Sequence, residues 1–302
     1  MNLLLTGCFK YTDEQLEAIK SLGYQIYSME SEKYDELPLP AEQIDATVCN
    51  YLFTAKDFKD FTNIKLIQLV SAGFDRVPVE EIKARGCKLL NARGVYSTPM
   101  AEWALFRVLE KYKHGWFFKT EQEKKCWSKN REIREVFGIK VAIIGAGNIG
   151  GEVAKKFKAL GANVDGYDIH TNTTPEFDNM LLIDAFKQNV GKYDVVILTV
   201  PLLPSTKGLI SKDILKSLKS EAIIVNISRG AIIDEHALIE VLSERRDIFA
   251  AMDVFEQEPL SDESPLWPLP NVAISPHNSF VSDGNNERMF NVIYSNLRDF
   301  IS

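Results

Sequence analysis

The sequence predicts an α/β protein built from two doubly wound parallel-sheet domains of the Rossmann and flavodoxin-like kind. Three observations predict this fold class. Short apolar runs alternate with amphipathic stretches from the start of the chain, a second series of the same kind begins near residue 141, and a GxGxxG motif opens that second series. Strands that alternate with helices are typical of parallel sheets, and 302 residues are enough for two separate cores.

The first series of apolar runs predicts the strands of one domain, at residues 3–6, 24–27, 46–49, 66–70 and 87–91. A helix is predicted over residues 12–22. Its two ends are marked in the sequence, because Thr12 and Gln15 have the spacing of a capping box and Gly23 suits a left-handed C-terminal cap.

A long helical pattern begins near residue 98 and is expected to link the two domains. The second series of apolar runs follows at residues 141–144, 163–167, 195–200, 222–227, 249–254 and 272–275. These runs are almost continuously apolar, as expected for strands covered on both faces by helices. The last helix is apolar along one face and is expected to return to the first domain. The predicted domains are therefore residues 1–96 plus 284–302, and residues 97–283.

Composition excludes several classes of partner. The chain has 35 basic and 42 acidic residues, a formal charge of -7, with no long basic run, so nucleic acid and anionic membranes are poor partners. No apolar run is long enough to span a bilayer. The four cysteines form no CxxC pair, which argues against a disulfide framework and a metal site. We expect a soluble protein of the reducing cytoplasm.

The glycine motif contains Gly145, Gly147 and Gly150, between an apolar strand and a helical pattern. The first glycine permits a tight turn, the second lets a pyrophosphate approach the backbone, and the third lets helix and strand pack closely. A lone motif of this kind is more often a simple turn, but Asp168 follows the next predicted strand. A carboxylate there can bind the ribose hydroxyls of NAD and would repel the extra phosphate of NADP. NAD is the expected cofactor, although the nearby His170 could soften the exclusion of NADP.

Three polar residues follow late strands of the second domain: Arg229, Glu258 and His277. Taken singly, Arg229 could form a surface ion pair, Glu258 could be a turn residue and His277 could be an ordinary loop histidine. Ligands nevertheless gather at the carboxyl ends of strands in open parallel sheets, so the three residues together suggest an active site.

The segments around these residues resemble those of the D-2-hydroxyacid dehydrogenase family. NISRGAIIDEHAL, DVFEQEPL and SPH are similar to late motifs of that family, and VSAGFDRV and NARGVYSTPMAEWAL are similar to its first-domain and linker-helix segments. The resemblance covers nearly the full length in the expected order. It implies a substrate domain, an NAD-binding Rossmann domain and reversible hydride transfer between NADH and a 2-keto acid.

The implied roles suit the chemistry of a keto acid. The guanidinium of Arg229 would grip the substrate and stabilise charge on the carbonyl oxygen. His277 would exchange the proton, and Glu258 would favour the protonated ring and fix its orientation. The resemblance also assigns softer contacts. Those to the cofactor come from Asn148, Ile149, Val200, Pro201, Thr206 and Asp253, and those to the substrate carboxylate come from the backbone amides of Ala72 and Gly73.

The sequence departs from the family after His277, where Asn278, Ser279 and Phe280 replace the usual small residues. This puts the size of the substrate in doubt. Tyr51, Leu52 and Phe53 could wall the substrate pocket or belong to the core. Arg93 is a candidate for binding a second anionic group, a hypothesis that Arg93→Ala would test.

Two other functions stay open at this stage. Formate dehydrogenases share the motifs but usually place a glutamine where Pro276 stands. An NAD(H)-sensing corepressor-like binding protein would keep the same three polar residues, although such proteins usually carry disordered extensions. The family is commonly dimeric, and the aromatic residues between 101 and 118 could form the interface of a homodimer.

Overall fold

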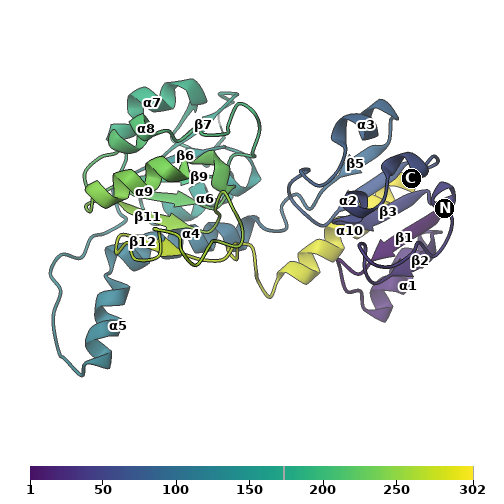
Figure 1. Cartoon of the computed structure of the whole chain (residues 1–302), viewed down its shortest axis with the longest axis horizontal. Coiled ribbons are helices and arrows are strands. Elements are labelled where there is room, and N and C mark those ends of the chain that lie inside the picture. Colours follow the sequence, from purple (N-terminus) through teal and green to yellow (C-terminus); the bar gives the residue numbers. More distant parts are fainter. Residues whose placement is uncertain (173, 302) are drawn as a thin grey trace. The chain divides into compact units, whose positions relative to one another are not determined.

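The computed structural model describes residues 1–172 and 174–301 and divides into two compact units, Met1–Tyr96 with Ser282–Ser302, and Ser97–Val281 (Figure 1). Each unit is an α/β layer structure around one parallel sheet. The predicted fold class is confirmed. Within the described residues, no helix is both long and apolar enough to cross a membrane.

The first unit contains a five-stranded sheet in the order β2-β1-β3-β4-β5, with every neighbouring pair parallel. Its strands are β1 (Asn2–Thr6), β2 (Gln25–Met29), β3 (Ala46–Cys49), β4 (Leu66–Leu69) and β5 (Lys88–Leu90). This is the flavodoxin-like strand order. The order reverses between β1 and β3, which makes the carboxyl ends of these two strands the expected place for a ligand.

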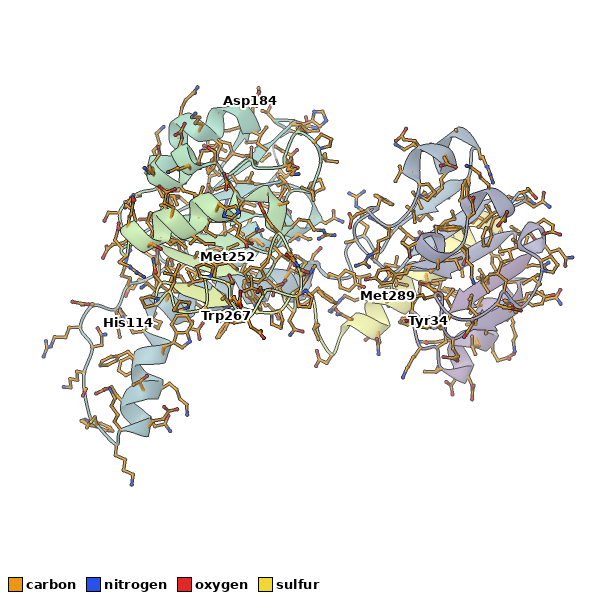
Figure 2. All side chains as sticks on the ribbon, viewed as in Figure 1. Tyr34, His114, Asp184, Met252, Trp267 and Met289 are labelled. Atoms are coloured by element: carbon orange, nitrogen blue, oxygen red, sulfur yellow. The ribbon has the colours of Figure 1, made fainter. Side chains whose placement is uncertain are left out.

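Helices cover both faces of this sheet. One face packs against α1 (Asp13–Ser21) and α10 (Asn285–Ile301), and the other against α2 (Leu52–Ala55), η2 (Phe58–Asp60) and α3 (Val79–Ala84), with η1 (Ala41–Gln43) beside them. The capping box of Thr12 and Gln15 forms as predicted. Met289, labelled in Figure 2, is only 4% exposed, because α10 turns its apolar side toward the sheet.

The second unit contains a seven-stranded parallel sheet in the order β12-β11-β10-β9-β6-β7-β8. Its strands are β6 (Lys140–Ile144), β7 (Asn163–Asp168), β8 (Asn179–Leu182), β9 (Val195–Leu198), β10 (Ile223–Asn226), β11 (Phe249–Met252) and β12 (Val272–Ile274). This is the Rossmann order with one added strand, and it reverses between β6 and β9.

The helices of the second unit are α4 (Ser97–Tyr112), α5 (Gly115–Glu123), α6 (Asn148–Ala159), α7 (Phe186–Asn189), α8 (Lys212–Lys216) and α9 (Glu235–Glu244), with η3 (Ile183–Ala185), η4 (Val190–Lys192) and η5 (Gly230–Ile232) between them. All eleven predicted strands are present within one or two residues of their expected ends. The sequence did not predict β8. It lies at the sheet edge with no fully buried residue, so its apolar signal is weak.

Helix α5 projects from the second unit (Figure 1) and has no buried residue. His114, labelled in Figure 2, begins it with a left-handed φ of 54°. The side chains of Trp116 and Phe118 are 43% and 39% exposed, and Trp127 in the following loop is 98% exposed. Three large aromatic rings therefore face solvent on this arm.

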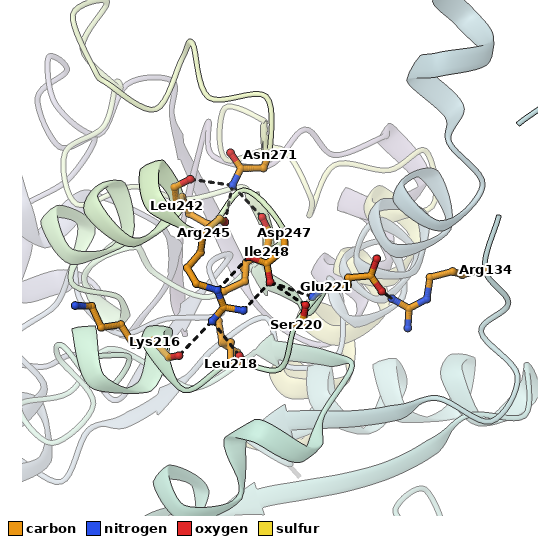
Figure 3. A network of polar contacts seen from close by, with 10 residues as sticks. All are labelled: Arg134, Lys216, Leu218, Ser220, Glu221, Leu242, Arg245, Asp247, Ile248 and Asn271. Carbon is orange, nitrogen blue, oxygen red and sulfur yellow. Dashed lines mark hydrogen bonds and ion pairs between the residues drawn. The ribbon is translucent and has the colours of Figure 1, made fainter. Parts of the chain in front are cut away.

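The amino-terminal ends of β10, β11 and β12 are tied together by a polar network (Figure 3). Arg245 donates from Nε and Nη2 to the carboxylate of Asp247, at 3.0 and 2.6 Å, and from Nη1 to the carbonyls of Lys216 and Leu218. The buried amide of Asn271 donates to three carbonyls. The polar side chains at this edge of the sheet are thus used for hydrogen bonds within the protein, and we call it the closed edge.

Candidate active site

The glycine loop joins β6 to α6 at the reversal point of the second sheet. Gly145 has a φ of 101°, and a Cβ there would lie 2.8 Å from the backbone nitrogen of Val200. A Cβ on Gly150 would lie 2.0 Å from the carbonyl oxygen of Gly145, so both positions require glycine. Gly147 differs, since nothing lies within 4 Å of the Cβ position there. The backbone over Gly147 is open to a ligand, next to Asn148 and Ile149 at the amino end of α6.

The loop after β9 lies directly beside the glycine loop. Val200 is 6% exposed and packs against Gly145, whereas Pro201 is exposed. The hydroxyl of Thr206 donates to the carbonyl of Pro201 at 2.6 Å and accepts from the amide of Leu203 at 2.8 Å. Thr206 therefore shapes this loop from a buried position, and its direct contact with the cofactor stays a prediction.

Asp168 ends β7 beside the glycine loop. One carboxylate oxygen accepts from the amide of Ala146 and the other from the amide of Ile169, both at 2.7 Å. These two bonds fix the carboxylate while leaving it partly exposed. Each carboxylate oxygen can accept further hydrogen bonds, which is the property required for binding two ribose hydroxyls.

Arg229 follows β10 and precedes η5. Its Nη1 donates to the carbonyl of Ser228 at 2.8 Å, and its own carbonyl accepts from the side chain of Asn226 at 3.0 Å. The amide oxygen of Asn226 also accepts from the backbone and hydroxyl of Ser228. Asn226 is fully buried, and sequence reasoning missed its role. Its position in the sequence could have indicated this role, because an asparagine that ends a buried apolar strand needs hydrogen-bond partners.

His277 and Glu258 form a hydrogen-bonded pair. The distance between Nδ1 of His277 and one carboxylate oxygen of Glu258 is 2.8 Å, and the other carboxylate oxygen accepts from the amide of Phe255 at 3.1 Å. The two side chains are 35% and 37% exposed. With Nδ1 donating to the carboxylate, Nε2 is the nitrogen left to exchange a proton with another molecule.

The loop that carries His277 is held by Asp253. The fully buried carboxylate of Asp253 accepts from the amides of Asn278 and Ser279 at 2.8 and 2.9 Å, and from the hydroxyl of Ser275. His277 has a left-handed φ of 49°, a conformation that these bonds stabilise. Because the carboxylate is buried and bonded to this loop, contact between Asp253 and the nicotinamide stays a prediction.

Phe280 departs from the family pattern, and the structure gives it a partner. Its ring stands edge-on to the imidazole of His277, with centroids 5.8 Å apart and planes at 88°. Phe280 therefore limits the orientations that the histidine ring can adopt. The other three histidines do not pair in this way: His170 and His236 are exposed, and His114 contacts the carbonyl of Glu132.

The loop after β4 in the first unit contains Ala72 and Gly73. The carbonyl of Ala72 accepts from the side chain of Asn91 at 2.5 Å, and that of Gly73 accepts from the hydroxyl of Ser71 at 2.9 Å. Within residues 1–172 and 174–301, the amides of these two residues donate no hydrogen bond. A loop with its carbonyls bonded and its amides available can bind a carboxylate.

Two of the three residues considered for the pocket wall belong to the core. Leu52 is fully buried, and the ring of Phe53 packs edge-on against Phe58 and Phe61. Tyr51 differs, because its side chain is 47% exposed at the carboxyl end of β3.

The second unit fits a dinucleotide. It combines an open backbone over Gly147, a helix amino terminus and a fixed carboxylate at Asp168, all beside the reversal point of the sheet. The residues predicted to bind the cofactor therefore come from neighbouring loops of one sheet edge.

Residues 105–279 match the family model described as D-isomer specific 2-hydroxyacid dehydrogenase, NAD binding domain. The chain is 33% identical to a hydroxypyruvate reductase of Thermotoga maritima over 249 residues, which cover 80% of each protein. It is 34% identical to a D-3-phosphoglycerate dehydrogenase of Methanocaldococcus jannaschii over 216 residues, 71% of this chain but only 41% of that longer protein.

Among solved structures, a D-isomer specific 2-hydroxyacid dehydrogenase family protein from Aeromonas salmonicida superimposes with a TM-score of 0.82. The alignment covers 99% of this chain and 95% of that one, at 24% identity. At this identity, the likeness establishes the two-sheet fold.

Proposed function

Because the chain belongs to the D-isomer specific 2-hydroxyacid dehydrogenase family and is thus an oxidoreductase acting on CH–OH groups, we propose that it interconverts a small 2-keto acid and the D-2-hydroxy acid. In the proposed direction, a hydride adds to the keto carbon and a proton adds to its oxygen. Bound NADH supplies the hydride. The products are the D-2-hydroxy acid and NAD⁺.

The proposed roles of the protein residues follow from their donors and acceptors. The amides of Ala72 and Gly73 bind the substrate carboxylate, and the guanidinium of Arg229 binds the substrate and polarises its carbonyl. Nε2 of His277 gives its proton to the carbonyl oxygen as negative charge develops there. Glu258 keeps the ring oriented through its hydrogen bond with Nδ1.

The observation that carries this proposal is the 2.8 Å contact between His277 and Glu258, with Glu258 itself held by the amide of Phe255. A histidine tethered in this way, with one nitrogen free to exchange a proton, is suited to general acid–base catalysis. It lies after β12 in the same sheet whose β6 leads into the glycine loop. Support for NAD over NADP comes from the fixed carboxylate of Asp168.

The test is consumption of NADH by the purified protein with glyoxylate, pyruvate, hydroxypyruvate, oxaloacetate, 2-ketoisocaproate and phenylpyruvate. We expect turnover of at least one of them, with the D-hydroxy acid as product. Arg229→Lys is the matched variant, because it keeps the charge but loses the planar fork of donors. NADH binding without turnover of any keto acid would contradict the proposal and favour an NAD(H)-sensing binding protein.

We further propose that the protein forms a homodimer through the α5 arm. The aromatic rings of Trp116, Phe118 and Trp127 are exposed there, and α5 has no buried residue of its own. Large exposed apolar rings are enriched at the cores of interfaces. Light scattering should give twice the mass of the 34.1 kDa chain, and Trp116→Glu should give the monomer.

The four cysteines are free thiols. Their presence supports the proposal that the protein works in the reducing cytoplasm.

A further inference from the structure

Arg76 lies in the first unit at the carboxyl edge of the five-stranded sheet, in the loop between β4 and α3. Its Nη1 donates to the side-chain oxygen of Asn50 at 2.9 Å. Its guanidinium carbon stands 4.0 Å from the centroid of the Tyr51 ring, which places a cation over an aromatic face. One hydrogen bond and one cation–π contact thus hold the guanidinium in place.

The two partners of Arg76 are themselves held by a buried carboxylate. Glu32 is 8% exposed and accepts from the amides of Asn50 (2.7 Å) and Tyr51, and from the hydroxyl of Thr6 at 2.5 Å. Thr6 ends β1, and Asn50 follows β3. Glu32 therefore joins the two strands between which the order of this sheet reverses, and ligands of parallel sheets gather at such a point.

The arginine keeps most of its binding capacity. Among the residues that the structure describes, no carboxylate forms an ion pair with Arg76, and only one of its five N–H donors is bonded. Its side chain is partly buried and borders a pocket of about 500 Å³. The charged residues that line this pocket with it are Lys56, Lys59, Asp57, Asp75 and Glu81. An arginine held by a hydrogen bond and an aromatic ring, partly desolvated and without an ion-pair partner among the described residues, can bind an anionic oxygen group.

The neighbourhood of Arg76 suggests which ligand this group belongs to. Gly73, one of the two residues proposed to bind the substrate carboxylate, precedes Arg76 by three positions in the same loop. A substrate that binds the amides through one anionic group and the guanidinium through another would carry two carboxylates.

We propose that Arg76, positioned by Asn50 and Tyr51, is a specificity-determining residue that binds a second carboxylate at the far end of the substrate. The preferred substrates are then 2-keto dicarboxylic acids. This inference rests on the proposed function and narrows its substrate class. In this proposal Arg76, rather than Arg93, binds the second anionic group. Arg93 borders a different pocket, of about 580 Å³, next to α10.

The experiment compares keto acids matched in chain length: oxaloacetate with 2-oxobutanoate, and 2-oxoglutarate with 2-oxopentanoate. The wild-type protein should prefer one diacid over its partner by at least about tenfold in kcat/KM, as expected for one charge-assisted bidentate contact. Arg76→Met should lower kcat/KM for that diacid by about ten- to a hundredfold and change the value for the monoacid by less than about threefold. Arg76→Lys, which keeps the charge without the fork, should fall between the two.

Arg93→Met is the matched control and should leave the diacid preference unchanged. A preference that disappears in Arg93→Met but not in Arg76→Met would overturn the inference. So would an equal loss for diacid and monoacid in Arg76→Met, which indicates a structural role. If Arg76→Met does not fold, the wild-type preference and Arg76→Lys still decide. Silence with all four keto acids and with the broader panel would contradict the proposed function itself, whereas turnover that favours monoacids would contradict only the second-carboxylate site.

Discussion

The two edges of the seven-stranded sheet differ in how their polar groups are used. At the amino-terminal edge, Arg245 bonds to the carboxylate of Asp247 and to backbone carbonyls, and the amide of Asn271 also bonds to backbone carbonyls, as Figure 3 shows. At the carboxyl edge, Nδ1 of His277 bonds to Glu258, which leaves Nε2 of the ring with capacity for a further partner. The same fold thus carries one edge closed on itself and one edge open to ligands.

Substitutions at the two edges of this sheet should therefore have different effects, on activity at one edge and on stability at the other. In a parallel sheet the loops at the carboxyl ends face the ligand, whereas those at the amino ends can only hold the strands together. Substitutions at the open edge should therefore lower the reaction rate with little effect on unfolding. Substitutions at the closed edge should do the reverse.

The largest effect is expected for His277→Asn. Asparagine tolerates the left-handed backbone at this position but cannot transfer the proton, so kcat should fall by about 10²- to 10⁴-fold. The melting temperature should change little. Steady-state kinetics with NADH and the preferred keto acid, beside a thermal melt, give both values. A large drop in melting temperature with retained activity would invert the comparison between the two edges.

A smaller effect is expected for Glu258→Gln. The amide keeps the size of the side chain but removes the negative charge beside the imidazole ring, so kcat for keto acid reduction should fall by roughly 10- to 100-fold. The loss should be below the roughly 10⁴-fold of a fully buried triad, because Glu258 is 37% exposed. Steady-state kinetics of keto acid reduction with NADH measure this loss, and a thermal melt checks that the variant keeps its fold. An unchanged kcat would exclude a role for the Glu258 carboxylate in the reaction.

Asp168→Ala tests the cofactor side of the open edge. Removing the carboxylate should raise KM for NADH by about tenfold, since about one charge-assisted hydrogen bond to the ribose is lost. The value for NADPH should rise less or fall, because the repulsion of its phosphate is also removed. The ratio of kcat/KM for the two cofactors measures this change. A ratio equal to that of the wild type would exclude Asp168 as the ribose ligand.

The smallest effect is expected at the closed edge, for Asp247→Asn. Hydrogen bonds from Arg245 hold the pKa of the Asp247 carboxyl well below its usual range. The variant should lose about 1 kcal/mol of unfolding free energy, after allowance for solvent screening of a carboxylate that is 34% exposed. Activity of the folded protein should be unchanged.

The pH dependence of that stability loss has a definite sign. Because the folded pKa of Asp247 is lowered, its stabilisation is complete above the unfolded pKa of about 3.9 and is lost as the pH falls toward the folded pKa. Denaturant unfolding at several pH values should show the wild type and Asp247→Asn converging below about pH 4. A difference that stays constant through this range would mean that the pair does not stabilise through charge.

The fold and much of the candidate site could be predicted from the sequence. Apolar runs and the periodicity of the segments between them located eleven strands, since a strand covered on both faces must be apolar along its whole length. Gly145 and Gly150 could be predicted for a steric reason, because only glycine avoids backbone clashes at these two positions of the loop.

Other features depend on residues far apart in the chain. No sequence pattern indicated that Glu32 would bond to the amides of Asn50 and Tyr51, or that Phe280 would stand against the ring of His277. Edge strand β8 escaped prediction because it buries too little apolar surface to leave a pattern.

Local sequence patterns were sufficient to predict the two sheets, the glycine loop and the identity of the polar residues at the strand ends, because periodicity and steric exclusion act between near neighbours in the chain. The packed structure is needed to show that Asn226 shapes the Arg229 loop, that Asp253 holds the His277 loop and that the Arg76 guanidinium lies over the ring of Tyr51. A hydrogen bond or a stacking contact requires two groups at a set distance and angle, and only the packed strands bring those groups together.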